Sequence, residues 1–306
     1  MTTLAPALAG LLVDVRARPT ATPAPTAPPP LSTWTEEHVT LRVEGGRVVA
    51  APVSPWDRRC PDCRDGWRIV RRDGYEFAER CACHGLRARV EAMTAARLPP
   101  DALGRTLAAY DWARLRASST ARCEGQECSP RAAIARHAER RAPPGRGLLI
   151  QGGTGTGKTH LAQGLVQWLC LRHGVRVRWA SWAQTLDDLR GAFGAGQRDD
   201  TARDHLARLV QAPVLAVDDL GSERGTEWSA SVFQGVVGAR LEMGGAMVLT
   251  TNLRVDADDR DPLSMRRRIG DRAMSRLLGA CDVIRLDAED YRPAPPGATA
   301  SRVRAR

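Results

Sequence analysis

The chain has 306 residues, enough for one full domain and a smaller module, and its apolar share of 43% fits a globular protein. It contains no run of about 18 apolar residues, so no membrane span is predicted. Residues 1–19 lack the basic start of a secretory signal, and we therefore expect a cytoplasmic protein. The formal net charge of +10 favours nucleic acid as a partner, although an arginine bias of the genome, in a chain whose only lysine is Lys158, explains the same charge.

Residues 1–55 are predicted to be a flexible N-terminal segment. Apolar residues at positions 4, 8, 11, 12 and 15 share one face of a short amphipathic helix, and the proline-rich residues 19–30 are typical of a linker. Residues 33–55 suggest a weak hairpin around Gly45 and Gly46. Plain disorder of the whole segment is the alternative.

Residues 56–95 are predicted to form a zinc-binding module. Two cysteine pairs flank a stretch in which Asp73 and Gly74 predict a two-residue hairpin turn that pairs Trp67 with Arg80. This turn brings four thiolates together, as tetrahedral Zn²⁺ requires; disulfides, the main alternative, are disfavoured in a reducing cytoplasm. Because the second pair is a tight C-x-C, His84 is an alternative ligand. The four predicted ligands are Cys60, Cys63, Cys81 and Cys83.

Residues 96–145 are predicted to be a helical connector, residues 146–292 the main domain, and residues 293–306 a basic tail. In the connector, Cys123 and Cys128 supply too few ligands for a second metal site. In the main domain, short apolar strands alternate with helices, which predicts an α/β three-layer sandwich with a central parallel sheet. The expected strands are residues 147–151, 175–181, 214–218, 247–251 and 283–286, and the expected helices are residues 158–173, 183–193, 202–209, 227–242 and 267–278.

A glycine-rich loop follows the first of these strands and satisfies G-x-x-x-x-G-K-[ST] in full. Its glycines allow backbone N–H groups to surround phosphates at the positive end of the following helix. We expect Lys158 to neutralise the β- and γ-phosphates of ATP, and Thr159 to bind Mg²⁺. The predicted ATP-binding residues are Gly152, Gly153, Thr154, Gly155, Thr156, Gly157, Lys158, Thr159 and His160.

Two later strands end in polar side chains. Asp218 and Asp219 follow an apolar run, and we expect Asp218 to hold Mg²⁺ and Asp219 to orient or deprotonate the attacking water. Glu223 is a weaker candidate for this second role. Asn252, the only asparagine, is predicted to contact the γ-phosphate or the water, a turn asparagine being the alternative.

Arg272 and Arg276 lie four residues apart on a predicted helix and therefore share one face. One of them is a candidate arginine finger that reaches the γ-phosphate of a neighbouring subunit. This interpretation predicts a homo-oligomer with ATP at the subunit interfaces. A solvated helix face is the alternative in so arginine-rich a chain.

The ordered set of these motifs resembles the DnaC/IstB-like branch of AAA+ ATPases over residues 98–292. The resemblance implies an AAA+ P-loop fold, ATP hydrolysis, and either the loading of a replicative helicase onto DNA or assistance to a transposase. Gly153, where the family more often has proline, and Asp219, where members vary between Asp and Glu, are departures, and the second would be compatible with slow hydrolysis. The matching segments are residues 155–162, 218–221, 250–253, 270–272, 275–277 and 290–292.

The predicted zinc module ahead of the ATPase resembles helicase loaders of the DnaC/DnaI type more than transposase helpers. We therefore interpret the chain as an ATP-dependent loader that binds a replicative helicase and single-stranded DNA, with an IstB-like transposase helper as the alternative. A P-loop kinase of small molecules would need an acceptor pocket and a lid, which no segment resembles. An adaptor with structural ATP is a further alternative, which a turnover measurement would test.

Overall fold

The computed structural model describes residues 33–36, 39–52, 67–72, 74–80, 84–139, 146–194 and 199–290. The predicted amphipathic helix, the proline-rich linker, the four predicted zinc ligands and the basic tail lie outside these ranges. Where the chain is described, no helix is both long and apolar enough to cross a membrane.

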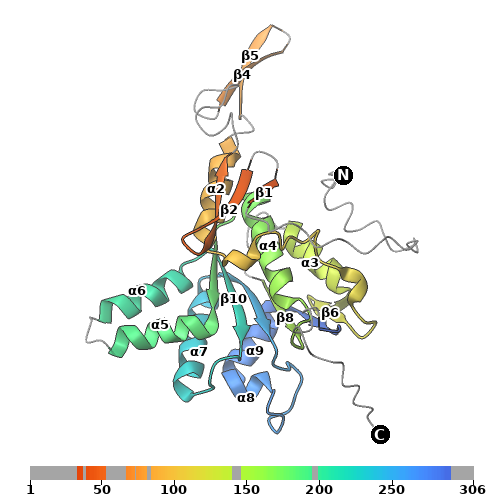
Figure 1. The fold of residues 1–306 in the computed structure, drawn as a ribbon, viewed down its shortest axis with the longest axis vertical. Helices are drawn as coiled ribbons and strands as arrows, with labels where there is room; N and C mark the ends of the chain where they lie inside the picture. Colours follow the sequence, from red (N-terminus) through yellow and green to blue (C-terminus); the bar gives the residue numbers. More distant parts are fainter. Residues whose placement is uncertain are drawn as a thin grey trace, which may run out of the picture.

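The centre of the molecule is a seven-stranded mixed sheet with the strand order β7-β6-β12-β8-β11-β10-β9 (Figure 1). The last five strands in this order are parallel, and they correspond to the five predicted apolar runs. Because they are parallel, the carboxyl ends of β8, β10 and β11 meet at one edge of the sheet. The parallel strands are β12 (Cys281–Leu286), β8 (Gly147–Gly152), β11 (Ala246–Thr251), β10 (Val214–Leu220) and β9 (Val177–Ser181).

The sequence predicts a central parallel sheet, and the structure differs from this prediction at one edge. β6 (Thr120–Cys123) pairs antiparallel with β12, and β7 (Gln126–Cys128) pairs antiparallel with β6. This hairpin lies within the predicted helical connector. The described residues 97–139 of the connector contain one α-helix, α3 (Pro130–Glu139), and two short 3-10 turns, η1 (Pro100–Ala102) and η2 (Trp112–Arg114). Glu124 and Gly125 both have positive φ and make the two-residue turn that joins the strands.

Helices cover both faces of the sheet, which confirms the α/β sandwich. Alternate residues of β8 face opposite sides: Leu148 and Ile150 belong to one apolar cluster and Leu149 to the other. The first cluster includes α4 (Lys158–His173), α3 and α2 (His84–Ala96). The second includes α5 (Trp182–Gly194), α6 (Asp199–Val210), α7 (Glu227–Glu242), α8 (Met265–Ile269) and α9 (Asp271–Ala280).

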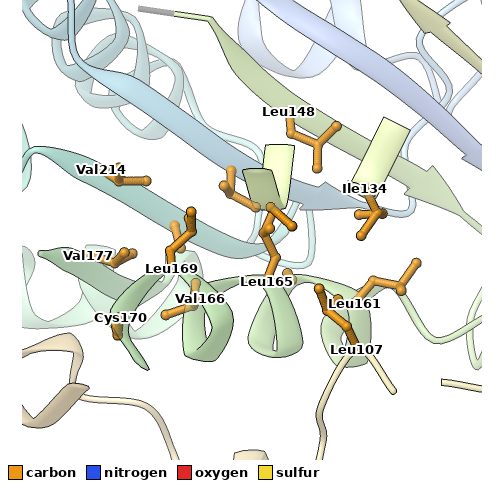
Figure 2. Close-up of a cluster of buried hydrophobic side chains, with 14 of the residues drawn as sticks. Leu107, Ile134, Leu148, Leu161, Leu165, Val166, Leu169, Cys170, Val177 and Val214 are labelled. Atoms are coloured by element: carbon orange, nitrogen blue, oxygen red, sulfur yellow. The ribbon is translucent and has the colours of Figure 1, made fainter. Parts of the chain in front are cut away.

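Helix α4 is held against the sheet by a continuous apolar stripe (Figure 2). Leu161, Leu165 and Leu169 recur every four residues, so they point to the same side of the helix, and all three are buried. Burying each leucine contributes roughly 2 kcal/mol, which fixes the helix that begins at the glycine-rich loop. The helix ends at Gly174, whose φ of 65° permits its N–H to bond the carbonyl of Cys170.

Residues 39–52 are part of the folded body, although they lie in the segment predicted to be flexible. β2 (Val39–Glu44) and β3 (Arg47–Pro52) form the expected hairpin around Gly45 and Gly46, with β1 (Thr33–Glu36) beside β2. Val39, Leu41 and Val48 are buried in the same cluster as α4, which explains why the hairpin packs rather than remains free.

A second hairpin, β4 (Trp67–Arg72) and β5 (Tyr75–Arg80), stands beyond α2 at the top of Figure 1. Trp67 pairs with Arg80, as the predicted turn requires, and Gly74 has a φ of 83°. Both faces of this hairpin expose apolar side chains, namely Trp67, Ile69, Tyr75 and Phe77.

Candidate nucleotide-binding site

The glycine-rich loop connects the end of β8 to the start of α4. Gly155 and Gly157 have φ values of 74° and 85°, which L-residues rarely adopt, so the loop path requires glycine there. The loop is closed internally by the hydroxyl of Thr156, which donates to the carbonyl of Gly153 at 2.9 Å. The chain thus has the geometry with which P-loops hold phosphates.

Lys158 lies at the mouth of this loop and is 7% exposed. Its Nζ donates to the carbonyl of Gly153 at 2.7 Å and to Oδ1 of Asn252 at 2.6 Å. The only lysine and the only asparagine of the chain therefore meet, as expected if both act on the same phosphate.

Three oxygen-bearing side chains converge beside Lys158. The hydroxyls of Thr159 and Thr250 both donate to Oδ1 of Asp218, at 2.9 Å and 2.6 Å. Burial raises the pKa of Asp218, and the hydrogen bonds from Thr250 and Thr159 oppose this shift. A hydroxyl and a carboxylate are the hard oxygen ligands that Mg²⁺ prefers, so Thr159 and Asp218 fit the predicted magnesium site.

Asp219 adopts a left-handed backbone conformation with a φ of 57°, which costs a non-glycine residue free energy. The register between β10 and β11 also shifts between Val217 and Leu220. Consecutive strand residues normally point to opposite faces, and such an irregularity re-aims a side chain. Asp219 reaches the site in this way, because Nδ2 of Asn252 donates to its Oδ1 at 3.3 Å.

Thr250 is a site residue that the sequence analysis missed. In addition to its bond with Asp218, its Oγ1 accepts the backbone N–H of Asp219 at 2.8 Å. One hydroxyl therefore positions both acidic residues. Its side chain is fully buried, as is that of Thr251, the next residue of the same strand, and the sequence does not show which of the two hydroxyls faces the acidic residues.

Tyr110 was also missed, and it supports the loop from outside. Its hydroxyl donates to the carbonyl of Thr156 at 3.0 Å, and its ring lies where a side chain on Gly157 would be. The ring also makes an edge contact with His160, whose Nε2 lies 2.9 Å from the carbonyl of Thr106. Burial lowers the pKa of His160, which favours the neutral form of this predicted ATP-binding residue.

The remaining predicted site residues, Glu223, Arg272 and Arg276, make no hydrogen bond to the phosphate loop among the described residues. The Glu223 carboxylate accepts the N–H of Gly221 at 2.8 Å, so it stabilises a local turn. Arg272 is exposed on α9, whereas Arg276 packs towards Gly238 of α7. No hydrogen bond among the described residues joins either arginine to the phosphate loop of the same chain, and the finger in trans stays a prediction.

The two cysteine predictions have different outcomes. Cys123, beside the turn of the β6–β7 hairpin, and Cys128, at the end of β7, are joined by a disulfide. The four predicted zinc ligands lie outside the described residues. Among the residues that are described, no three His, Cys, Asp or Glu side chains gather as metal ligands, so Zn²⁺ stays a prediction.

The loop, its lysine and the two carboxylates at the end of β10 define a P-loop nucleotide-binding domain. The sequence profile of the family described as IstB-like ATP binding protein matches residues 82–295, and the chain belongs to this family. The ATP-binding family that the ordered motifs predict is therefore confirmed.

Individual relatives point to two kinds of protein. An ATP-binding protein of an insertion sequence from Mycobacterium tuberculosis is 28% identical over 51% of this chain and 60% of its own length. The replicative helicase loader DnaC of Buchnera aphidicola is 25% identical over 47% of this chain and 56% of its own. A crystal structure of the DnaC helicase loader has a TM-score of 0.45 at 23% identity, covering 51% of this chain and 88% of that one. The chain thus spans a little over half the length of the two curated relatives.

Proposed function

We propose that the chain is an ATP-dependent loader of a replicative helicase, which acts in the cytoplasm on single-stranded DNA. The observation that carries its ATPase part is the hydrogen-bonded chain from Lys158 through Asn252 to Asp219. These hydrogen bonds link Lys158, which would bind the γ-phosphate, to Asp219, which would act on water.

In the proposed hydrolysis, one water molecule adds to the γ-phosphorus and the bond to the ADP oxygen breaks, giving ADP and phosphate. Asp219 orients this water and accepts its proton, while Lys158 neutralises charge on the phosphate oxygens. Thr159 and Asp218 would hold Mg²⁺, which supplies electrostatic stabilisation of the phosphates when it is bound. Asn252 senses whether the γ-phosphate is present. Its side chain accepts a hydrogen bond from Lys158 and donates one to Asp219, so it connects the phosphate-binding lysine to the carboxylate.

The loader assignment is supported by the β4–β5 hairpin, which precedes the matched family region. Its exposed aromatic residues, Trp67, Tyr75 and Phe77, offer a surface for a protein partner, and the predicted zinc ligands flank it in sequence. The DnaC relative is a loader by name. The insertion-sequence relative favours the second candidate, a transposase helper with the same ATPase core.

Co-purification with the replicative helicase of the host or its phage, with and without ATP, tests this proposal. A loader retains the helicase in an ATP-dependent manner, and binding to a transposase instead of the helicase would establish the helper.

The enzymatic part is tested separately by ATP turnover with and without single-stranded DNA. Lys158→Ala is expected to lower ATP affinity and abolish turnover. Wild-type protein that binds ATP without turnover would instead indicate an adaptor with structural ATP.

A further inference from the structure

A pocket of about 800 Å³ lies beside the phosphate loop, and Thr159 and Asp218 are among the residues that line it. Its walls come from segments that are far apart in the sequence: β3, the segment after α2, β9 and α6. Each of these segments contributes one arginine. The four arginines are Arg47, Arg97, Arg178 and Arg208.

These arginines have no acidic partners in the part of the chain that the structure describes. Among the described residues, none of the four forms an ion pair or a side-chain hydrogen bond. Nε of Arg178 is buried without any hydrogen-bond partner. Burial is the main cause that lowers the pKa of Arg178. The nearby positive charges of Arg47 and Arg208 lower this pKa further. Gathering like charges and leaving a buried donor unsatisfied both cost free energy, so the arrangement requires compensation.

Three carboxylates also line the pocket, but each has another partner. Asp101 forms an ion pair with Arg105 at 3.0 Å. Asp188 accepts a hydrogen bond from Gln184 at 2.9 Å, and Asp218 belongs to the predicted magnesium site. Because Gln184 is neutral, Asp188 keeps its charge. The four arginines still outnumber the two carboxylates without an ion pair among the described residues, Asp188 and Asp218, so the pocket retains excess positive charge.

We propose that this pocket binds the phosphate groups of a second phosphorylated ligand, in addition to the nucleotide held by the P-loop. A guanidinium presents a planar fork of donors that matches phosphate oxygens and is always charged. Phosphodiesters of single-stranded DNA and free oligophosphates share this chemistry. The inference extends the proposed function, because Thr159 and Asp218 line both sites and would connect the second ligand to the nucleotide.

The test uses the full chain with Mg²⁺ and a saturating non-hydrolysable ATP analogue, so that the P-loop is occupied. Fluorescence anisotropy of a labelled fifteen-nucleotide oligothymidylate is measured over a range of salt concentrations. Arg178→Gln and, separately, Arg47→Gln are expected to weaken binding roughly tenfold each and to reduce the slope of log affinity against log salt by about one. Inorganic tripolyphosphate, at constant free Mg²⁺, is expected to compete with the oligonucleotide.

Arg87→Gln is the matched control, because it removes an equal charge from a side chain that is 88% exposed on α2 and does not line the pocket. Unchanged binding of the ATP analogue shows that each variant is folded. If Arg178→Gln loses thermal stabilisation by tripolyphosphate but keeps oligonucleotide binding, the ligand is a free oligophosphate.

Equal binding of both probes by wild type, both pocket variants and Arg87→Gln would overturn the proposal. Failure of the loader function would be distinguishable, since a chain that retains no helicase can still bind these two probes through the pocket.

Discussion

At the scale of single residues, the hydroxyl of Thr250 connects the two acidic groups of the nucleotide site. It donates to Oδ1 of Asp218 and accepts the backbone N–H of Asp219. The left-handed conformation of Asp219 is costly, and this hydrogen bond is one of the contacts that hold it. The arrangement therefore uses a buried neutral group to position two charged ones.

Replacing Thr250 by valine preserves the shape of the side chain but removes both hydrogen bonds. We expect ATP turnover to fall at least about tenfold, because the loss of a bond to a charged group corresponds to roughly 1.5–3 kcal/mol. ATP affinity should change much less, since Lys158 and the loop are intact. Steady-state kinetics together with equilibrium binding of a fluorescent nucleotide separates the two effects.

Thr251→Val is the matched control for this prediction. Thr251 is also fully buried, but its hydroxyl donates to the carbonyl of Leu220 and accepts the N–H of Leu253, away from the carboxylates. It should lower the melting temperature to a similar extent and leave turnover nearly unchanged. Equal losses of turnover in both variants would show that Thr250 acts only through stability.

At the scale of secondary-structure elements, Asp282 fastens β12 to the elements around it. Its carboxylate is 0% exposed and lies 3.0 Å from Nε2 of His137 on α3 and 2.6 Å from Nε of Arg146, just before β8. Burial by itself would raise the pKa of Asp282. The hydrogen bonds from His137 and Arg146 outweigh burial and hold the pKa of this carboxyl well below its usual range.

Asp282→Asn is expected to lower the free energy of unfolding at pH 7 by roughly 2 kcal/mol, less than for a fully buried ion pair because Arg146 is partly exposed. A depressed pKa means that the stabilisation is fully present above the unfolded value of about 4 and is lost as the pH falls below it. The difference between wild type and variant should therefore shrink below about pH 4. Urea unfolding at a series of pH values measures it.

Asp287→Asn serves as the control for the same experiment. Asp287 pairs with Arg116 at 3.2 Å, but its side chain is 45% exposed, so its replacement should cost less than about 1 kcal/mol. Two results would contradict the role of the Asp282 carboxylate in holding β12 to its neighbours. One is a loss of unfolding free energy in Asp282→Asn that is no larger than in Asp287→Asn; the other is a loss that stays unchanged in acid.

At the scale of the whole molecule, the predicted arginine finger requires a second copy of the chain. Arg272 and Arg276 lie on α9, and neither bonds to the phosphate loop of its own chain among the described residues. If one of them acts in trans, the variant Arg272→Ala/Arg276→Ala and the variant Lys158→Ala should each be inactive alone. A mixture of the two creates some interfaces with an intact loop and an intact finger.

An equimolar mixture is expected to recover about a quarter of the wild-type turnover, because a head-to-tail interface combines one site from each neighbour. Activity of the mixture that stays at the level of the two separate variants would exclude a finger in trans at these positions. A control mixture contains the two variants, Arg272→Ala/Arg276→Ala and Lys158→Ala, together with a large excess of wild-type chain. This mixture controls for the exchange of subunits between oligomers.

Much of the nucleotide site could be predicted because its residues follow a local pattern. The phosphate loop is one contiguous motif, and Asp218, Asp219 and Asn252 each follow an apolar strand. Since parallel strands end at the same edge of a sheet, their meeting is a consequence of the strand pattern alone. The contact of Lys158 with Asn252 agrees with this expectation.

In this protein, the sequence alone determined the P-loop, the five parallel strands and the β4–β5 hairpin, because each depends on residues that are neighbours in the chain. Only the tertiary structure decided the role of Thr250, the support of the loop by Tyr110, and the β6–β7 addition to the sheet. It also decided the gathering of Arg47, Arg97, Arg178 and Arg208 around one pocket. These features arise when segments far apart in sequence pack together, and the period of apolar residues carries no record of which distant side chains will meet.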